Sequence, residues 1–277
     1  MKKVLVFGGT HGNEWTGVWL VEKYAEYFRK KYPSLDLEFI LANPEAYKIN
    51  KRFKDEDLNR AFQFIDQDRP GSYEHHRAKE IREMILKEPC FVIDLHTTTS
   101  NMGKTLIITD YNPLVLWLAQ EAEKNVPDTR IIGSPDPSKK YLASQVPTSL
   151  MVEVGPIANG TIEPNALEGS VALLDQLLLK LSNLPATLTG EFELFVEVED
   201  VKYPVDEKGE LSAYIHSGFQ AKDFTKIDGE YTPFRKFSGE EIRSKTTGPR
   251  YPIFINEAAY YPQHLAYTLC EKKRMKY

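Results

Sequence analysis

Short apolar runs alternate with longer amphipathic runs over the first two thirds of the chain. The run KVLVFGG at 3–9 is rich in β-branched residues and stops at glycines, which is typical of a buried strand. The same reasoning predicts strands at 36–43, 90–96, 105–110 and 149–155, and helices at 15–32, 73–89, 112–124 and 165–184. This alternation favours an α/β fold with a largely parallel sheet and helices on both of its faces.

The pattern changes after about residue 185. The stretch 190–204 alternates apolar with acidic side chains at period two, which predicts a strand with one face in water. A hairpin turning at DEKG (206–209) and an extended run at 251–262 follow, without a long helix. We therefore predict an α/β domain at 1–185 and a smaller β-rich domain at 186–277, and we interpret the basic run KKRMK near the C-terminus as a solvated tail.

Charge and composition narrow the classes of function. The 277 residues carry a net charge of −5 without a basic block, which argues against nucleic acid or an acidic membrane surface as a partner. No apolar run approaches the roughly 20 residues of a membrane span, and the first run is shorter than the roughly 7–15 residues of a signal-peptide core. Cys90 and Cys270 are too few for a disulfide framework, so we expect buried free thiols in a reducing, cytoplasmic setting.

Three of the predicted buried strands deliver ionisable side chains at their C-terminal ends. His11 and Glu14 follow the first strand, His96 ends the strand at 90–96, and Glu153 lies near the end of the strand at 149–155. Ligands of α/β sheets bind at this edge, and polar residues in otherwise apolar strands need a reason. Two imidazoles and a carboxylate match the ligand set of catalytic zinc sites, with Glu153 as the further carboxylate that serves as general base.

Other interpretations of these residues fit less well. The stretch GGTHGNE lacks the Gly-Lys-Ser/Thr of a phosphate loop and the G-x-G-x-x-G of a dinucleotide site, and Glu14 would repel phosphate. A single histidine at a strand end is more often structural, but His11, Glu14 and His96 form a set. A structural zinc site would favour four ligands with cysteine among them, and neither cysteine lies near these motifs. His75 and His76 lie in a charged helix, where we expect both to be solvated.

The polar segment NKRFKDEDLNRAF at 50–62 has two interpretations. It is too polar for a strand and too broken for a helix, so a solvated loop is one of them. The other is a binding segment, because Arg52, Asn59 and Arg60 lie close together and arginines dock carboxylates and stabilise oxyanions. Asp94, two residues before His96 on the same strand face, either orients an imidazole or caps a neighbouring backbone group.

Five motifs in order resemble one enzyme family. FGGTHGNE, DLNRAF, DLHTTTSNMG, VEVGP and NEAAYYP together are similar to the aspartoacylase branch of the aspartoacylase/succinylglutamate desuccinylase family, and they cover nearly the whole chain. The resemblance implies a zinc carboxypeptidase-like N-terminal domain and a smaller β-rich C-terminal domain. It also implies hydrolysis of N-acyl amino acids, typically N-acetyl-aspartate to acetate and aspartate.

The resemblance further assigns roles to single residues. It implies that His11, Glu14 and His96 bind one zinc ion per subunit. Glu153 would be the general acid/base, and Arg52 would polarise the scissile carbonyl. The implied contacts with the substrate carboxylates are Asn59, Arg60 and Tyr260. Arg52 and Glu153 would thereby also contact the substrate. Tyr260 would reach the pocket from the C-terminal domain.

The sequence departs from the family pattern at two places. Thr97 stands where the family has an asparagine, and its hydroxyl still offers a hydrogen bond. The segment 141–153 holds Ser144 and Gln145 where animal members carry an arginine that binds a substrate carboxylate, and Tyr141 is left without an assigned role. One charged contact is therefore missing or is replaced from elsewhere.

N-acyl-aspartate is the first expectation for the substrate. The alternatives are another N-acyl amino acid, aromatic or succinylated, a carboxypeptidase-like peptidase activity, and metal binding without catalysis. The expected partner is thus a small molecule, and a homo-oligomer is compatible with the sequence.

Overall fold

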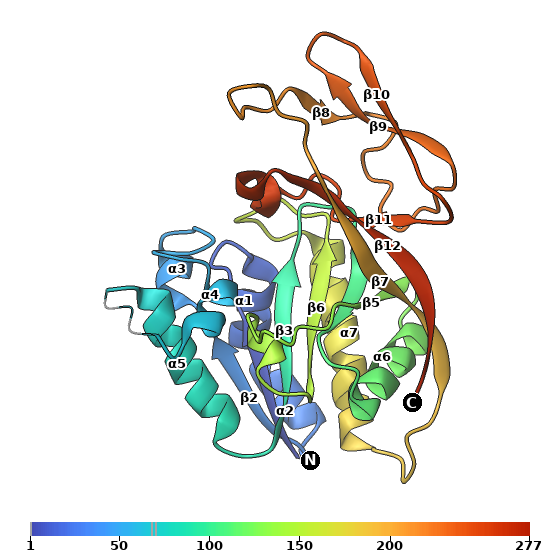
Figure 1. Cartoon of the computed structure of the whole chain (residues 1–277). Helices are drawn as coiled ribbons and strands as arrows, with labels where there is room; N and C mark the ends of the chain where they lie inside the picture. The colour runs from blue at the N-terminus through green and yellow to red at the C-terminus, as the bar shows by residue number, and fades with distance from the viewer. Residues whose placement is uncertain (1, 68, 70) are drawn as a thin grey trace.

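The computed structural model describes residues 2–67, 69 and 71–277. Within these residues, nine strands form one large sheet in the order β11-β12-β7-β5-β4-β6-β3-β1-β2, and three strands form a small one (Figure 1). The strands of the large sheet are β1 (Lys3–Gly8), β2 (Asp36–Leu41), β3 (Cys90–Thr97), β4 (Gly103–Ile108), β5 (Thr129–Gly133), β6 (Ser149–Gly155), β7 (Glu191–Lys202), β11 (Tyr251–Ile253) and β12 (Leu265–Lys276).

The pairing in the large sheet is mostly parallel, as the sequence predicts. β2, β1, β3 and β6 run parallel to one another, as do β4, β5 and β7. β4 and β6 pair antiparallel, and β12 is antiparallel to both β7 and β11. All residues of β3 are buried, which explains why its sequence is a nearly continuous apolar run.

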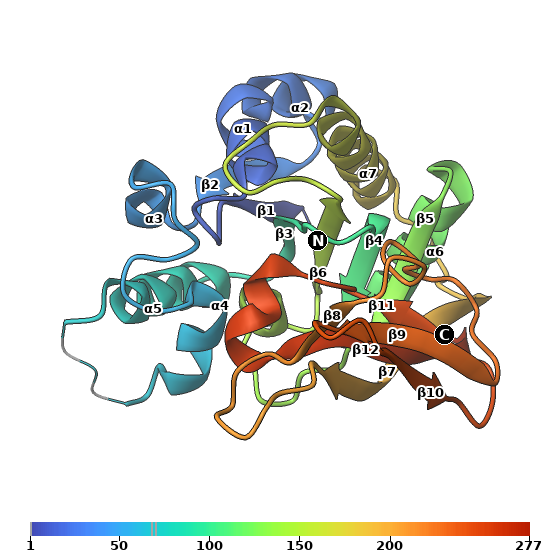
Figure 2. The ribbon, with the colours of Figure 1, turned by 90° about the horizontal axis from the view of Figure 1, so that it is seen from above.

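Helices cover both faces of the parallel part of the sheet (Figure 2). The helical elements are α1 (Trp15–Lys23), α2 (Ala25–Lys31), α3 (Pro44–Lys48), α4 (Leu58–Ala61), α5 (Tyr73–Leu86), α6 (Pro113–Asn125) and α7 (Pro164–Ser182), with the short 3₁₀ helices η1 (Phe62–Phe64), η2 (Leu142–Ser144) and η3 (Ala258–Gln263). α1, α2, α6 and α7 share a core with Val4 and Ile93, whereas α4 and α5 pack against Leu5 and Val92. Neighbouring strand residues belong to different cores because strand side chains alternate between faces.

Several elements differ from the prediction made from the sequence. The run expected to be extended at 251–262 forms β11 only at its start and becomes the helical segment η3 from Ala258. The helix expected at 15–32 is broken at Tyr24, whose φ of −102° and ψ of −6° separate α1 from α2. β5 is missed, because its apolar side chains are only Ile131 and Ile132, too few to establish a period. The segment at 50–62 does contain a helix, the one-turn α4, which begins after Asp57 as N-cap.

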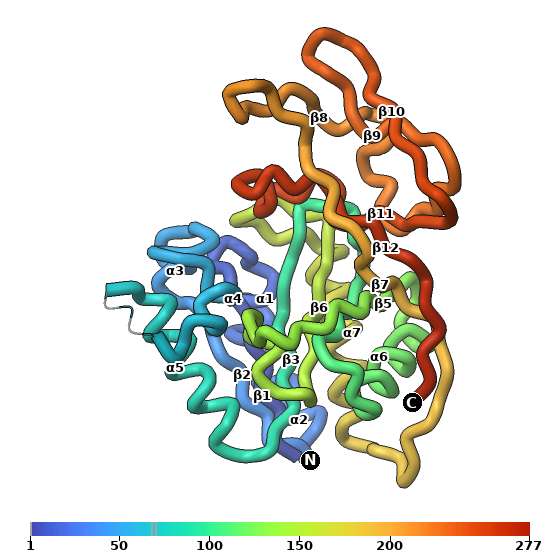
Figure 3. Tube along the Cα trace, viewed as in Figure 1, coloured from blue at the N-terminus to red at the C-terminus, as the bar shows by residue number. Residues whose placement is uncertain are grey.

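The β-rich C-terminal segment continues the large sheet. The long strands β7 and β12 pair with each other, and β7 pairs with β5 (Figure 3). Between them the chain forms the small antiparallel sheet of β8 (Ala213–Ile215), β9 (Glu230–Lys236) and β10 (Glu241–Lys245). The predicted turn at DEKG is present, with the Gly209 N–H donating to the Asp206 carbonyl at 3.0 Å.

The basic run KKRMK is not a tail. Its residues 272–276 belong to β12 and pair with β7, where their basic side chains face a strand rich in glutamate, as in the ion pair of Arg274 with Glu191 at 3.0 Å. The basic side chains are exposed, as predicted, but the interpretation as a tail was wrong, because a run of charges gives no sign that its backbone completes a sheet.

The burial of the two cysteines agrees with the prediction, whereas that of the two histidines agrees only in part. Cys90 and Cys270 are buried free cysteines, as predicted. His76 is exposed as expected, but His75 is only 1% exposed, because it lies one turn before Ala78 on the face of α5 that packs on the sheet. No helix within the described ranges is long and apolar enough to cross a membrane.

A buried carboxylate in the segment between β8 and β9 predicts a pH-dependent stability. Asp223 is 8% exposed, and its Oδ1 accepts a hydrogen bond from the Ile255 N–H at 3.0 Å, whereas its Oδ2 has no partner among the described residues. Burial raises the pKa of Asp223 from the ordinary 3.8 to about 6. The folded chain therefore holds this proton more tightly than the unfolded chain, and its stability should fall as pH rises from about 4 to about 6.

We expect Asp223→Asn to remove this component, which is on the order of 3 kcal/mol for a pKa difference of two units. Urea unfolding of both proteins at intervals between pH 4 and pH 7 measures it. Replacing the carboxyl group with an amide changes the free energy of unfolding by the same amount at each pH. The difference to compare is therefore the slope of the free energy of unfolding against pH. Parallel profiles for the native and variant proteins would contradict the assignment.

Candidate metal centre and active site

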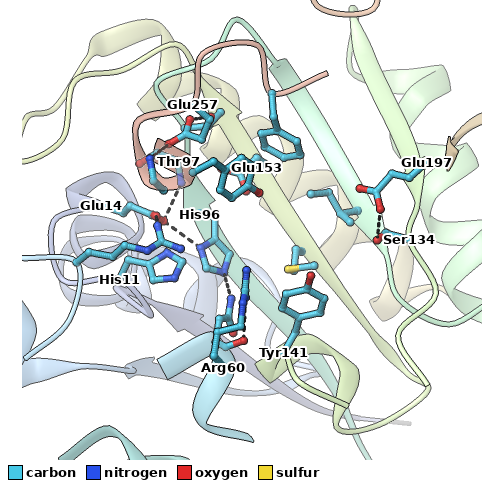
Figure 4. Close-up of a pocket in the computed structure, with 18 residues that line it drawn as sticks. His11, Glu14, Arg60, His96, Thr97, Ser134, Tyr141, Glu153, Glu197 and Glu257 are labelled. Atoms are coloured by element: carbon cyan, nitrogen blue, oxygen red, sulfur yellow. Dashed lines mark hydrogen bonds and ion pairs between the residues drawn. The ribbon is translucent and has the colours of Figure 1, made fainter. Parts of the chain in front are cut away.

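Three candidate ligands meet at the C-terminal edge of the sheet. His11 and Glu14 lie between β1 and α1, and His96 lies near the end of β3, the parallel neighbour of β1. The Glu14 carboxylate lies between the two imidazoles, with Oε1 2.6 Å from His11 Nδ1 and Oε2 2.9 Å from His96 Nδ1 (Figure 4). One ligand atom from each residue lies within 4.8 Å of the others, and all three residues are buried.

Glycines make the turn that carries His11 and Glu14. Gly9 has a φ of +69°, a conformation that side chains with a Cβ rarely adopt. A Cβ on Gly12 would lie 2.2 Å from the backbone of Ala46, so the loop can approach α3 only without a side chain there. The glycines of this segment therefore let the chain reverse closely around the ligand cluster, and they do not form a phosphate loop.

The outward nitrogens of both imidazoles contact carboxylates. His96 Nε2 lies 2.8 Å from Asp94 Oδ2, and His11 Nε2 lies 3.2 Å from Asp57 Oδ1. Asp94 is itself fixed by the Thr10 hydroxyl, which donates to its Oδ1 at 2.7 Å. Of the two interpretations of Asp94, the structure supports the one in which it orients an imidazole. Such carboxylate–histidine pairs commonly fix the ring and tautomer of metal-ligating histidines.

The charges of Glu14, His11 and His96 shift the pKa values within the cluster. Burial opposes the ionisation of Glu14, but the charges and hydrogen bonds of His11 and His96 outweigh it and hold the pKa of Glu14 well below its ordinary range. Burial likewise opposes charge on His96, but Asp94 and Glu14 outweigh it and raise the pKa of His96 well above its ordinary value. Glu14 thus stays ionised although it is buried, and its negative charge favours a positive charge beside it.

These residues fit a single divalent metal ion. Two imidazole nitrogens and one carboxylate oxygen converge, and their other ring nitrogens are held by carboxylates. Three protein ligands of this kind, with a position left for water or substrate, characterise catalytic zinc sites.

Glu153 lies beside the ligand cluster on β6. β6 pairs parallel with β3, and Glu153 stands in register with His96. Burial raises the pKa of Glu153 well above its ordinary value, and the charges of Glu14 and Glu257 raise it further, against the opposing effects of His96 and Arg52. A carboxyl group with a raised pKa can exchange a proton near neutral pH.

Arg52 is tied to the same cluster by Asp57. Its Nε and Nη2 donate to Asp57 Oδ2 at 3.1 and 3.0 Å, and its Nη1 lies 3.5 Å from Glu14 Oε1. Asp57 therefore connects Arg52 to His11, and its Oδ1 also accepts from the Asn59 N–H at 2.9 Å as the N-cap of α4. Asp57 was missed as a site residue in the sequence, although it is the first letter of the motif DLNRAF.

Asn59 and Arg60 face the cluster from α4. Asn59 is 4% exposed, with its Oδ1 accepting from the Leu142 N–H at 3.0 Å and its Nδ2 3.3 Å from His96 Nε2. The Arg60 guanidinium lies 5.1 Å from the ring centre of Tyr141. The segment 50–62 is therefore part of the site rather than a solvated loop.

A buried carboxylate on α5 holds this segment in place. Glu74 Oε1 accepts from the Lys54 N–H at 2.7 Å and from the Asn43 side-chain amide at 3.1 Å, and its Oε2 accepts from the N–H groups of Asp55 and Glu56. Backbone groups that lack a helix or strand partner are satisfied here by one side chain. Nothing in the sequence marked Glu74, because it looks like an ordinary charge of an amphipathic helix.

A second buried carboxylate brings Tyr260 to the site. Glu257 Oε2 accepts hydrogen bonds from the loop after β3, from the hydroxyls of Thr98, Thr99 and Ser100 and from the N–H groups of Thr99 and Ser100. Its Oε1 caps η3 by accepting from the Ala259 N–H at 3.0 Å. Tyr260 lies in η3, so Glu257 fixes the C-terminal segment that carries Tyr260 against the strand that carries His96.

The segment that departs from the family pattern is occupied by its own structure. The Ser144 hydroxyl donates to Asp136 Oδ2 at 2.7 Å, and the Gln145 amide donates to the carbonyls of Lys139 and Tyr141. Both side chains are buried, and neither lines the pocket above the cluster. They therefore shape the loop that positions Tyr141 and supply no charge in place of an arginine.

All eight candidate site residues line one pocket. Thr97 also lines it, and its N–H donates to Glu14 Oε2 at 3.0 Å. The complete lining is His11, Glu14, Arg52, Asn59, Arg60, His96, Thr97, Thr98, Ile107, Ser134, Tyr141, Met151, Glu153, Glu197, Phe254, Glu257, Ala259 and Tyr260 (Figure 4).

Comparison with known proteins agrees with this geometry. Residues 1–181 match the model of the succinylglutamate desuccinylase/aspartoacylase catalytic domain, and residues 190–272 match that of the AstE/AspA barrel-sandwich hybrid domain. The crystal structure of murine aminoacylase 3 superposes with a TM-score of 0.89 at 28% identity, covering 99% of this chain and 96% of that one.

Two similar curated proteins carry different names. A probable aspartoacylase of Trichodesmium erythraeum is 32% identical over 100% of this chain and 99% of its own length. An N-acyl-aromatic-L-amino acid amidohydrolase (carboxylate-forming) of Xenopus tropicalis is 35% identical over 98% and 93%. From the two family matches and the relatives above 30% identity, the chain belongs to the succinylglutamate desuccinylase/aspartoacylase family of hydrolases.

Proposed function

We propose that this protein is a zinc-dependent amidohydrolase that deacylates N-acyl-L-amino acids, with N-acyl-L-aspartate as its first candidate substrate. The observation that carries the proposal is the buried set of His11, Glu14 and His96 with Glu153 in register beside His96. His11, Glu14 and His96 would hold the ion. When bound, zinc would supply the Lewis acidity that polarises a carbonyl and lowers the pKa of a water molecule.

Glu153 would move the proton in this reaction. Its carboxylate would accept a proton from the attacking water and then give it to the departing amine, so that the amide C–N bond breaks to leave a carboxylate and a free amino acid. Its position next to His96, and the effect of burial on its pKa, support this role. A binding site without catalysis would have no use for such a group.

Arg52 would stabilise the negative charge that develops on the carbonyl oxygen. Its guanidinium stays charged at any working pH, and Asp57 holds it in place at 3.0–3.1 Å. Arg60, Asn59 and Tyr260 would contact the substrate carboxylates. We further propose that 1–185 supplies the catalytic groups and 186–277 closes the pocket through Tyr260.

The pocket also gives a reason for a second candidate substrate. Within the described lining, Arg52 and Arg60 are the basic side chains apart from the two histidines, while Ile107, Met151 and Phe254 form an apolar wall. With Arg52 at the carbonyl oxygen, Arg60 is the arginine left for substrate carboxylates. An N-acyl-aspartate brings two carboxylates, whereas an N-acyl-aromatic amino acid brings one carboxylate and an apolar ring. The names of the relatives point to both substrates.

A substrate panel with metal control tests the proposal. We expect the zinc-loaded protein to release the free amino acid from N-acetyl-L-aspartate or, for the second candidate, from N-acetyl-L-phenylalanine, and a chelator to abolish this until zinc is restored. His11→Ala should lose stoichiometric zinc by elemental analysis, whereas His76→Ala, an exposed histidine of α5, should keep it. Turnover that survives removal of zinc would contradict the proposal.

Glu153→Gln tests the proton transfer separately from metal binding. We expect kcat to fall by roughly 10²–10⁴-fold, because the amide cannot accept the proton, with the zinc content unchanged. Steady-state kinetics and elemental analysis of the same preparation measure both. A variant that retained near-normal kcat would exclude Glu153 as the general base.

Glu257→Gln tests how the C-terminal segment is held. A glutamine has one acceptor oxygen and a donor NH₂ that would face the Thr98, Thr99 and Ser100 donors, so η3 should shift with Tyr260. We expect a rise in KM of roughly tenfold, equivalent to the loss of a charged hydrogen bond, with zinc content retained. Glu163→Gln, which alters the half-buried N-cap of α7, is the matched control. An unchanged KM would show that Glu257 does not position Tyr260.

A further inference from the structure

The pocket extends well beyond the ligand cluster. From His11, Glu14 and His96 it passes Tyr141 and ends at Ser134 and Glu197 (Figure 4). We call the part lined by Ile107, Ser134, Met151 and Glu197 the distal arm. The proposed chemistry at Glu153 and Arg52 uses none of these side chains.

The floor of the distal arm is apolar. Ile107 of β4 and Met151 of β6 are partners in antiparallel pairing and are each 6% exposed. They belong to the hydrophobic cluster that joins the large sheet to the C-terminal segment. A ligand lying along this floor would therefore gain by presenting methylene groups to it.

A carboxylate, that of Glu197, lies at the end of the distal arm, and the charge of Lys140 acts on it without forming an ion pair. The Ser134 hydroxyl donates to Glu197 Oε2 at 2.8 Å, and Glu197 has no ion-pair partner among the described residues. Lys272, on the neighbouring strand β12, lies near Glu193 instead, at 3.7 Å. Glu197 is an exposed residue, so its carboxylate is open to a ligand.

Of the other carboxylates of the pocket, Glu14 and Glu257 are engaged by protein groups, and Glu153 has the proposed proton-transfer role. Glu14 lies between two imidazoles, and Glu257 accepts from six donors. Arg52 is paired with Asp57, so the distal arm receives no cation from that side. Glu197 is therefore the carboxylate left to interact with a ligand.

We infer that the distal arm binds an apolar stem that ends in an ammonium group, with the stem on Ile107 and Met151 and the ammonium at Glu197 and Ser134. The inference rests on the proposed amidohydrolase function and specifies the substrate class of that site. The ammonium can belong to the side chain of the amino acid or to the acyl group, which are the two arms of substrate leading away from the scissile amide. In the second case an aspartate can still occupy the amino-acid position.

Matched substrate pairs test this inference. In each pair an ammonium replaces a methyl group: Nα-acetyl-L-ornithine against N-acetyl-L-norleucine for the side chain, and 4-aminobutanoyl against pentanoyl on one amino acid for the acyl group. We expect the ratio of kcat/KM within at least one pair to favour the ammonium. Glu197→Gln should lower that ratio about three- to fivefold, the effect of a partly solvated ion pair, and leave the apolar substrate unchanged.

Glu199→Gln is the matched control, because Glu199 lies two residues further along the same strand and does not line the pocket. The pair whose kcat/KM ratio falls in Glu197→Gln identifies which end of the substrate enters the distal arm. A lower ratio in either pair supports the inference. The same ratio in the native and Glu197→Gln proteins for both pairs would overturn it.

The proposed function can fail separately from this inference. No turnover of any compound, the apolar ones included, would contradict the amidohydrolase. The affinities of the same four compounds for the zinc-loaded protein, measured by calorimetry, then test the inference. Glu197→Gln must weaken the binding of the ammonium compounds and leave that of the apolar compounds unchanged.

Discussion

The site depends on three parallel strands that end at one edge. β1, β3 and β6 lie side by side, so residues separated by more than eighty positions in the chain arrive next to one another. In particular, the register of β3 with β6 sets His96 beside Glu153. Regular backbone pairing places these groups, and the buried sheet keeps them there.

Loops need a different device, and here it is the buried carboxylate. Glu74 gathers the backbone N–H groups of the segment before α4, and Glu257 gathers those of the loop after β3. Each satisfies several donors that no helix or strand would satisfy, and each thereby fixes a loop that carries Arg52 or faces Tyr260. Asp57 does the same for side chains, since it joins His11 to Arg52.

The difference between strands and loops explains what could be predicted from the sequence. The α/β class, most strands and the strand-end residues follow from periodicity, because the ends of parallel strands must meet whatever the distance between them in the chain. Glu74 and Glu257 could not be singled out by periodicity, because their partners are loop N–H groups whose positions only the tertiary structure sets. Asp57 stands in the motif DLNRAF, but its contacts with His11 and Arg52 are likewise set by the tertiary structure. β5 was missed for its shortness, and the pairing of 272–276 because charge patterns do not report sheet edges.

The place of β5 in the sheet has a consequence for how the two parts of the chain fold. β5 pairs with β4 on one side and with β7 on the other, and the cluster of Ile107, Ile132 and Met151 packs against Phe195 and Phe254. Without the C-terminal segment, β5 would become an open strand edge beside an uncovered apolar patch, a combination that invites aggregation. The C-terminal segment is therefore as much a part of the folding unit as a wall of the pocket, and the chain cannot be shortened to its N-terminal part without exposing both.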